Sequence, residues 1–290
     1  MRMSKYAIIS AINWAHADYF IEHWLPSLHA TTNLSQIEIV VIDMGLRPNQ
    51  QATLKKHVTI VPCEVKTHPT AARFFTIEQY LQAHNYQKAL LIDGGDIFFQ
   101  SDISAIFNLK GDKVYAAQCV SRGLFYEWFL PSCFPLSTAL ELYRLVSLKP
   151  AYSAGVMVGE RKALLKLLAG MNAYLQAVHH YGADQIVMNY VGHKQALLAD
   201  LPQTFNFSSL TGWEQFTVMK GKVYDSRQQL VTVVHNAGRI PLMRVFGTMG
   251  YRQHNASLNY AGLWIRRIFS PGTLLAAWLL GKINERIFSA

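Results

Sequence analysis

Three side chains in this sequence could bind a divalent cation together. Asp93 and Asp96 flank two glycines directly after the apolar run at residues 89–92, and His235 follows a second apolar run, QLVTVV. Two carboxylates so close together repel each other, and burial raises that cost unless solvent or a cation relieves it. Mg²⁺ and Mn²⁺ bind carboxylates, and an added imidazole favours Mn²⁺. Asp-Gly turns are common, so a turn with solvated aspartates is the alternative.

The elements that must position these residues alternate between strands and helices. Apolar runs predict strands at residues 6–12, 37–42, 59–65 and 89–92, and helical spacing predicts helices at 19–28, 49–57 and 71–84. This order predicts an α/β fold with a Rossmann-like, mostly parallel central sheet flanked by helices. Ligands bind beyond the carboxyl ends of such strands, which is where Asn13, Asp43 and Asp93 fall.

The second half of the chain has a less regular pattern. Strands are predicted at residues 114–118, 152–158 and 229–234, and helices at 161–168 and 184–191. No internal repeat and no low-complexity linker divides the sequence. We therefore expect one domain at residues 1–257, followed by a tail at 258–290.

The composition narrows the class of protein and its partners. Of 290 residues, 51% are hydrophobic and 16% charged, which is globular rather than disordered. The net charge of +9 favours anionic ligands, but no Lys/Arg run carries interleaved aromatics, so no nucleic-acid partner is expected. The three cysteines are isolated, which predicts reduced thiols rather than a zinc or disulfide framework. The N-terminus has no signal-peptide pattern, and we expect a cytoplasmic protein.

The tail combines aromatic, aliphatic and basic residues. Its longest uncharged stretch, 268–281, is too short for a spanning helix by the criterion of ~20 residues, and Pro271 interrupts it. This amphipathic pattern suits a helix on an anionic membrane surface, at the inner membrane face. Packing on the domain or on a second subunit is the alternative.

Six short stretches follow one another in a set order: IVVIDMGL (39–46), LLIDGGDIFF (90–99), YSAGVMV (152–158), ADQIVMN (183–189), LPQTFNF (201–207) and VVHNAG (233–238). Together they resemble glycosyltransferases of the A-type fold, close in pattern to glycosyltransferase family eight and the collagen-type glycosyltransferases. The order is more specific than any single stretch and covers most of residues 6–240. The resemblance implies a retaining hexosyltransferase with Mn²⁺, or Mg²⁺, and a nucleotide-sugar donor, most often a UDP-sugar.

The same resemblance implies roles for single residues. Asp93, Asp96 and His235 would hold the metal, and Asp184 and Gln185 would face the sugar hydroxyls as catalytic residues. The implied donor contacts are Asn13, Asp43, Arg73, Ser153, Ala154, Gly155, Gly238 and Arg239. Simpler roles compete for three of the residues: Asp43 as a turn cap with Gly45, Arg73 as a solvated helix cation, and Asp184 as a helix N-cap.

The sequence also departs from the family pattern. The family's histidine motif continues to a lysine, a proline and a tryptophan, whereas this chain reads HNAGRIPLMR, with Arg239 or Arg244 as substitutes. Ser153 stands where the family has Asn, and no residue is an evident covalent nucleophile. The acceptor stays open between a glycan, a lipid-linked saccharide and a protein, including a host protein modified by a secreted effector. An inactive nucleotide- or glycan-binding module is the alternative function. A nucleotidyltransferase is disfavoured, because no glycine-rich, lysine-bearing loop follows the first strand.

Overall fold

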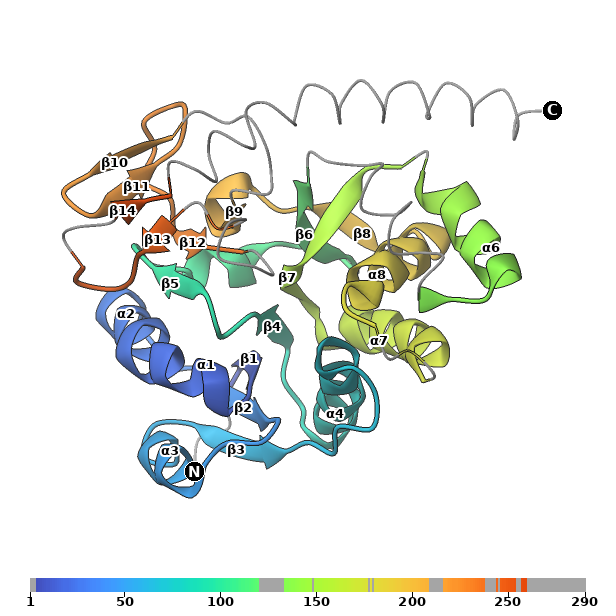
Figure 1. Ribbon diagram of the computed structural model, residues 1–290, viewed down its shortest axis with the longest axis horizontal. Coiled ribbons are helices and arrows are strands. Elements are labelled where there is room, and N and C mark those ends of the chain that lie inside the picture. Colours follow the sequence, from blue (N-terminus) through green and yellow to red (C-terminus); the bar gives the residue numbers. More distant parts are fainter. Residues whose placement is uncertain are drawn as a thin grey trace.

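A seven-stranded sheet forms the centre of the protein (Figure 1). The computed structural model describes residues 4–119, 133–147, 149–176, 178, 180–208, 216–237, 244, 246–253 and 257–259. The strand order is β3-β2-β1-β4-β7-β6-β8. The strands are β1 (Tyr6–Ile12), β2 (Ile37–Asp43), β3 (Thr59–Pro62), β4 (Lys88–Ile92), β6 (Val114–Cys119), β7 (Ala151–Glu160) and β8 (Leu198–Asp200).

The sheet is parallel except for β7, which runs antiparallel to β4 and β6. The predicted mostly parallel α/β sheet is therefore confirmed. The reversal of β7 has a consequence for the site. Ile92, the last residue of β4, pairs with Val156, so residues 153–155 lie at the edge where the parallel strands end.

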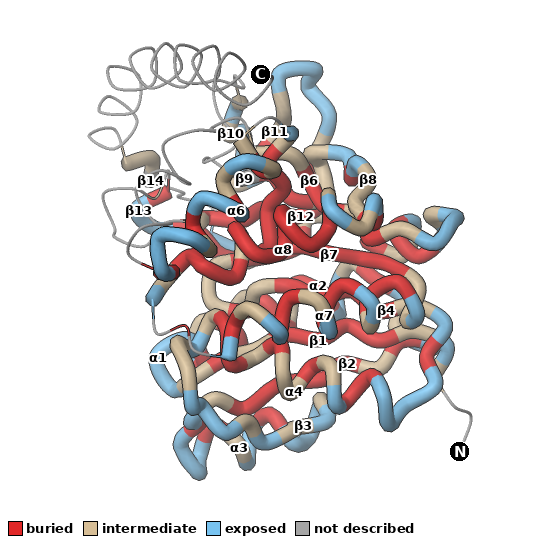
Figure 2. The backbone as a smooth tube through the Cα atoms, turned by 90° about the vertical axis from the view of Figure 1, so that its right-hand side faces the viewer, coloured by how far each residue is buried: buried red, intermediate tan, exposed pale blue. Residues whose placement is uncertain are grey.

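Helices cover both faces of the sheet, and the burial pattern of the strands explains why. Along β1, Ala7 and Ile9 pack into one hydrophobic cluster while Ile8 and Ile12 pack into another, because successive side chains point to opposite faces. The first cluster includes α4 (Pro69–Ala83), α6 (Leu136–Val146), α7 (Arg161–Leu175) and α8 (Ala183–Lys194); the second includes α1 (Trp14–Tyr19), η1 (Phe20–Trp24), α2 (Leu25–Thr31) and α3 (Pro48–Leu54). Figure 1 shows the two layers on either side of the sheet, and Figure 2 shows that the strands are mostly buried.

The predicted helix at 19–28 lies within a longer helical segment that contains a π-helical turn. This turn is η1, between α1 and α2. Phe20 and Trp24 are fully buried in it, with stacked rings 4.3 Å apart, and Trp24 meets Phe99 edge-on at 5.1 Å. The Trp24 indole N–H also donates to the carbonyl of Asp93 at 3.1 Å. The turn therefore packs against the loop that follows β4. π-Helical turns are often found at functional sites.

A second, three-stranded sheet lies beside the first, in the order β5 (Ile97–Phe99), β12 (Val233–His235), β9 (Phe207–Ser208). The predicted strand at 229–234 is only partly correct, because the strand covers Val233–His235. Asp225 accepts hydrogen bonds from the amides of Arg227 and Gln229, and the resulting turn removes the start of that stretch from the ladder. The predicted strand at 59–65 likewise ends early, at Pro62.

Several short elements were not predicted. They include β5, β8, β9, η2 (Ser104–Asn108), η3 (Gln203–Phe205) and the hairpins β10 (Thr217–Met219) with β11 (Lys222–Tyr224) and β13 (Phe246–Thr248) with β14 (Ser257–Leu258). The longer helix α6 was also not predicted. Leu258 pairs with Phe246 in the last hairpin, so strand β14 crosses the predicted boundary between domain and tail. Residues 260–290 of the tail lie outside the described residues. Within the described part of the chain, no helix has both the length and the apolar character that crossing a membrane requires.

Candidate active site at the carboxyl edge of the sheet

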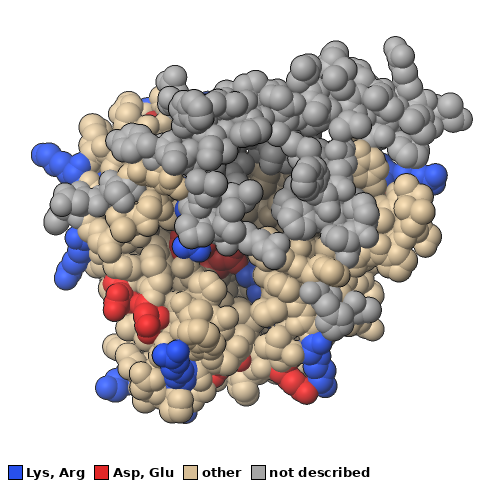
Figure 3. Space-filling model, viewed as in Figure 1, with Lys and Arg blue, Asp and Glu red and all other residues tan. Residues whose placement is uncertain are grey.

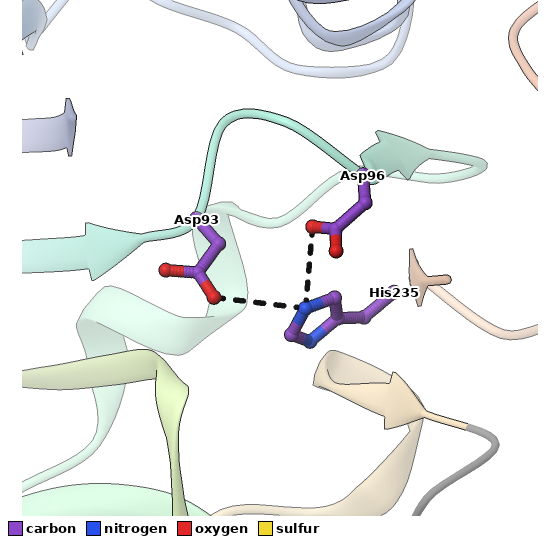
Figure 4. A group of neighbouring side chains, drawn as sticks. All are labelled: Asp93, Asp96 and His235. Carbon is purple, nitrogen blue, oxygen red and sulfur yellow. Dashed lines mark ion pairs between the residues drawn. The ribbon is translucent and has the colours of Figure 1, made fainter. Parts of the chain in front are cut away.

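Asp93, Asp96 and His235 converge in the structure, as the sequence predicts (Figure 4). One ligand atom from each lies within 4.8 Å of the others. His235 Nε2 is 3.3 Å from Asp96 Oδ1 and 3.6 Å from Asp93 Oδ2. Two carboxylate oxygens and one imidazole nitrogen form a donor set suited to Mn²⁺, and also to Mg²⁺ if the imidazole contributes weakly. These residues could therefore hold one divalent ion.

Backbone pairing brings the three ligands together from distant parts of the chain. Asp93 directly follows β4, and its amide donates to the carbonyl of Gly155 on β7 at 2.9 Å. Asp96 precedes β5, in which Ile97 pairs with His235 of β12. The amide of Asn236 then donates to the Asp96 carbonyl at 2.8 Å. The small sheet thus positions His235 beside the loop that carries both aspartates.

The two glycines between the aspartates are needed for space. A Cβ on Gly94 would lie 2.5 Å from Ile12 Cγ2, and one on Gly95 would lie 2.8 Å from Cγ of His16. Neither glycine has a positive φ. Close packing on β1 and α1 is therefore the physical reason for two glycines between the two aspartates.

Gly155 has a similar role on the other side of the ligands. A Cβ there would overlap the His235 ring at Cε1 and lie 2.9 Å from Asp93 Oδ2. Any side chain at this position would therefore displace a ligand or fill the space between the ligands. The absence of a side chain lets the backbone of β7 form one wall of the site.

Arg73 joins the metal ligands to the predicted sugar-facing residues. From α4, its guanidinium contacts Asp93 Oδ1 through Nη1 and Asp184 Oδ2 through Nη2, the latter at 3.2 Å. Its side chain is 13% exposed, so it is not a solvated helix cation. Burial alone would lower the pKa of Arg73, but Asp93 and Asp184 raise it, and the group stays charged.

Electrostatics within the site favour an ion pair between His235 and Asp96. Burial would raise the pKa of Asp96, but His235, Arg244 and His16 outweigh burial and lower this pKa. Burial would lower the pKa of His235, but Asp96 and Asp93 outweigh it and raise this pKa. Burial raises the pKa of Asp184 despite the opposing effect of Arg73. Figure 3 shows acidic side chains beside basic ones in a hollow near the centre of one face.

The predicted sugar-facing residues lie on neighbouring elements. Asp184 is in the first turn of α8 and its side chain is directed to Arg73; it is not the N-cap, which is Gly182. The next residue, Gln185, accepts a 3.4 Å hydrogen bond from the amide of Ala154. Ser153 is buried and its hydroxyl accepts from the Gly155 amide at 3.2 Å. These residues therefore line the same edge as the metal ligands.

The two residues predicted to hold the nucleoside make local hydrogen bonds. Asn13 caps α1 by accepting from the amide of Ala15 at 3.1 Å. Asp43 Oδ1 accepts from the amides of Gly45 and Leu46, and Oδ2 accepts from the side chain of Gln51 at 2.7 Å. The turn-cap interpretation of Asp43 thus describes what its carboxylate does here. Gly238 and Arg239 lie outside the described residues.

Three further residues contribute to the site, and sequence reasoning missed two of them, Asn206 and Trp24. Asn206 accepts a hydrogen bond from the ring of His235. Trp24 holds the Asp93 carbonyl, and Arg244 acts on the carboxylate of Asp96. Asn206 had a detectable signal, because it is the one polar residue in the aromatic stretch FNF within a recognised landmark. Trp24 offered no such signal, whereas the sequence already pointed to Arg244 as a substitute for the lysine of the family's histidine motif.

Comparison with known proteins identifies the fold. No protein-family model and no curated protein matches the chain. Among solved structures, the chain is similar to the bifunctional glycosyltransferase WbbM, with 16% identity and a TM-score of 0.54 over 82% of this chain. This chain spans about half of WbbM, since the match covers 46% of that protein.

A second match is of nearly equal length. The galactosyltransferase LgtC, in complex with donor and acceptor sugar analogs, is 16% identical with a TM-score of 0.53, over 89% of this chain and 94% of LgtC. An active-site mutant of LgtC gives 15% identity and a TM-score of 0.54 over the same shares. Likeness at this identity shows the fold, which is the A-type glycosyltransferase fold expected from the sequence.

Proposed function

We propose that this protein is a metal-dependent glycosyltransferase that moves a hexose from a nucleotide-sugar to an acceptor. The observation that carries the proposal is the convergence of Asp93, Asp96 and His235 at the carboxyl edge of an A-type fold. Arg73 contacts both Asp93 and Asp184, so it links the proposed metal ligands to the proposed sugar-facing residues. The solved structure of LgtC with donor and acceptor sugar analogs supports the choice of ligands.

The chemistry of glycosyl transfer suits these side chains. Breaking a glycosyl–phosphate bond leaves a nucleoside diphosphate and an electron-poor sugar carbon. A bound Mn²⁺ or Mg²⁺ would supply Lewis-acid neutralisation of the diphosphate. Asp184 and Gln185 are placed to orient sugar hydroxyls, and Arg73 holds Asp184 in position. Ser153 and Gly155 leave the adjoining wall small.

We propose a UDP-sugar as the donor and a glycan, a lipid-linked saccharide or a protein as the acceptor. We also retain the proposal that the protein is cytoplasmic and that residues 258–290 contact an anionic membrane at its inner face. Flotation of the full chain and of a variant without residues 260–290 on anionic vesicles tests this. Equal flotation of the two proteins would contradict a role for the tail.

The proposed activity is tested by donor turnover. The full chain is incubated with a panel of nucleotide-sugars, with Mn²⁺ or with chelator, and released nucleoside diphosphate is measured. We expect slow hydrolysis of one donor that depends on metal and is lost in Asp96→Asn. Asp102→Asn is the matched control, because Asp102 is exposed and, among the described residues, its carboxylate accepts hydrogen bonds from Ser104 alone.

The outcomes separate the two candidate functions. Metal-dependent release that survives Asp102→Asn but not Asp96→Asn supports the enzyme. Metal-dependent binding of UDP without release from any donor supports the catalytically inactive binding module. Neither binding nor release would show that the two aspartates only form a turn, and the proposal would fail.

A further inference from the structure

Asn206 contacts the imidazole that faces both aspartates. Its Oδ1 lies 2.9 Å from Nδ1 of His235, and both side chains are buried. We infer that Asn206 sets the metal preference of the site by orienting His235 and fixing its tautomer. This inference rests on the proposed function, because it concerns the ion that the site would hold.

The small sheet explains why these residues meet. In β9, Phe207 pairs with Val234, so Asn206 stands one residue before this pairing and next to the strand that ends at His235. On the other side of β12, Ile97 pairs with His235, and Asp96 stands one residue before it. The starts of β5 and β9 and the end of β12 thus bring the carboxylate, the imidazole and the amide together.

The direction of the hydrogen bond determines which nitrogen can bind an ion. A carboxamide oxygen accepts, so Nδ1 must carry the proton and Nε2 keeps its lone pair when the ring is neutral. Nε2 is the atom that faces Asp96 and Asp93. With the amide reversed, its N–H would donate to Nδ1, and the proton would move to Nε2, where an ion must bind. Only the orientation in which Oδ1 of Asn206 faces Nδ1 of His235 leaves Nε2 free to bind a metal.

The other half of the Asn206 amide indicates that its role is specific. Among the described residues, Asn206 Nδ2 has no hydrogen-bond partner although the residue is fully buried. Burying an unsatisfied amide nitrogen destabilises a protein. A packing role would be served better by an apolar residue of the same size. The hydrogen bond between Oδ1 of Asn206 and His235 therefore explains why residue 206 is an asparagine.

An oriented imidazole changes the preference among ions. Carboxylates and water suit both Mg²⁺ and Mn²⁺, whereas an imidazole is a better ligand for Mn²⁺. If Asn206 no longer held the ring, Mn²⁺ would lose a ligand, and Mg²⁺ would keep its two carboxylates. A general collapse of the site would weaken both ions alike.

The test measures binding of the two metals to the full chain without any sugar donor. Free Mn²⁺ is followed by electron paramagnetic resonance, and Mg²⁺ binding is measured by competition. For Asn206→Ala and the size-matched Asn206→Leu we expect Mn²⁺ affinity to fall about 10–100-fold, the usual effect of losing an outer-shell partner. Mg²⁺ affinity should change much less. Asn206→Asp keeps the acceptor and should keep the preference for Mn²⁺.

Asn172→Ala is the matched control. Asn172 is another buried asparagine, bonded to Glu78 and remote in sequence from the ligands, and its replacement should leave the ratio of the two affinities unchanged. Equal loss of both metals in the Asn206 variants, or no loss of either, would overturn the inference while the proposed function stands. No metal binding by the unmodified chain would overturn both.

Discussion

Asp43 and Asp93 lie at the carboxyl ends of two strands of the same sheet, on either side of β1, yet their carboxylates have different kinds of partner. Asp43 is the last residue of β2 and Asp93 follows β4, and each is buried or half-buried, with a glycine within two residues. The carboxylate of Asp43 accepts hydrogen bonds from nearby groups: the amides of Gly45 and Leu46 and the side chain of Gln51. The carboxylate of Asp93 instead faces Arg73 and His235.

The difference lies in the partners of the oxygens and not in the sequence pattern. A carboxylate that accepts several nearby N–H groups acts as a structural cap, because those bonds occupy most of its lone-pair sites and fix its orientation. A carboxylate whose partners are side chains from distant elements can exchange one partner for an ion. By this criterion the carboxylate of Asp43 stabilises its turn, whereas the carboxylate of Asp93 is available to bind an ion.

The sharpest test replaces each aspartate with asparagine. At Asp93 the negative charge is needed to hold the ion, so we expect metal-dependent turnover to fall about 10²–10³-fold in Asp93→Asn. At Asp43 an amide oxygen can still accept from the turn, and the Gln51 amide can rotate to accept from the new N–H. Asp43→Asn should therefore keep turnover within a few-fold. Released nucleoside diphosphate measures both; similar losses would erase the distinction.

The second test removes the cap altogether. Asp43→Ala leaves the amides of Gly45 and Leu46 without their acceptor. We expect the free energy of unfolding to fall by about 2 kcal/mol, because unsatisfied buried donors cost about that much. Chemical denaturation measures the loss, and Mn²⁺ affinity per folded molecule should be unchanged. A loss of metal binding without a loss of stability would place Asp43 in the site.

The same contrast shows how far the sequence could lead. The strands and helices of the first half follow from apolar runs and turn residues, and the three metal-ligand candidates follow from carboxylates and an imidazole at strand ends. Local sequence could not separate Asp43 from Asp93, because the partners of Asp93 come from α4 and β12. The π-helical turn under Asp93 depends on the packing of Phe20 and Trp24, which also is not a local property.

The small sheet was beyond sequence reasoning for a similar reason. Its strands are two or three residues long, and they become a sheet only when β5 and β9 come to either side of β12. Periodicity cannot indicate a strand of two residues. The contact of Asn206 with His235 depends on that pairing, so local sequence alone cannot indicate this contact.

The affinity of the Asp93 site for Mn²⁺ should depend on pH, because His235 is one of its ligands. Asp96 and Asp93 raise the pKa of His235, and an incoming ion must displace the Nε2 proton. Mn²⁺ affinity should therefore fall about tenfold per pH unit below that raised pKa and level off above it. In the metal-free protein the sign is opposite: the stability from protonated His235 is present at low pH and is lost as pH rises through the raised pKa.

Thermal unfolding with and without Mn²⁺ reports both effects. The gain in stability from Mn²⁺ should be larger near pH 8 than near pH 6, because at the lower pH the ion must displace the proton of His235 more often. His235→Asn is the control, in which the pH dependence of this gain should be lost. An equal gain at both pH values in the unmodified protein would show that His235 does not exchange a proton for the ion.

The smallest expected effect compares two glycines, one beside each aspartate. Gly45 has a φ of +106°, and a Cβ there would have no atom within 4 Å, so Gly45→Ala costs only backbone strain. We expect a loss of about 1 kcal/mol in the free energy of unfolding and no change in metal affinity. Gly155 has no such φ, but its Cβ would overlap the ring of His235, so Gly155→Ala should weaken Mn²⁺ binding. Denaturation should show a loss of stability in Gly45→Ala, and metal titration should show a loss of Mn²⁺ affinity in Gly155→Ala alone. If Gly155→Ala changed only stability, the wall of the site would be a packing feature, and the contrast between the two turns would rest on the aspartates alone.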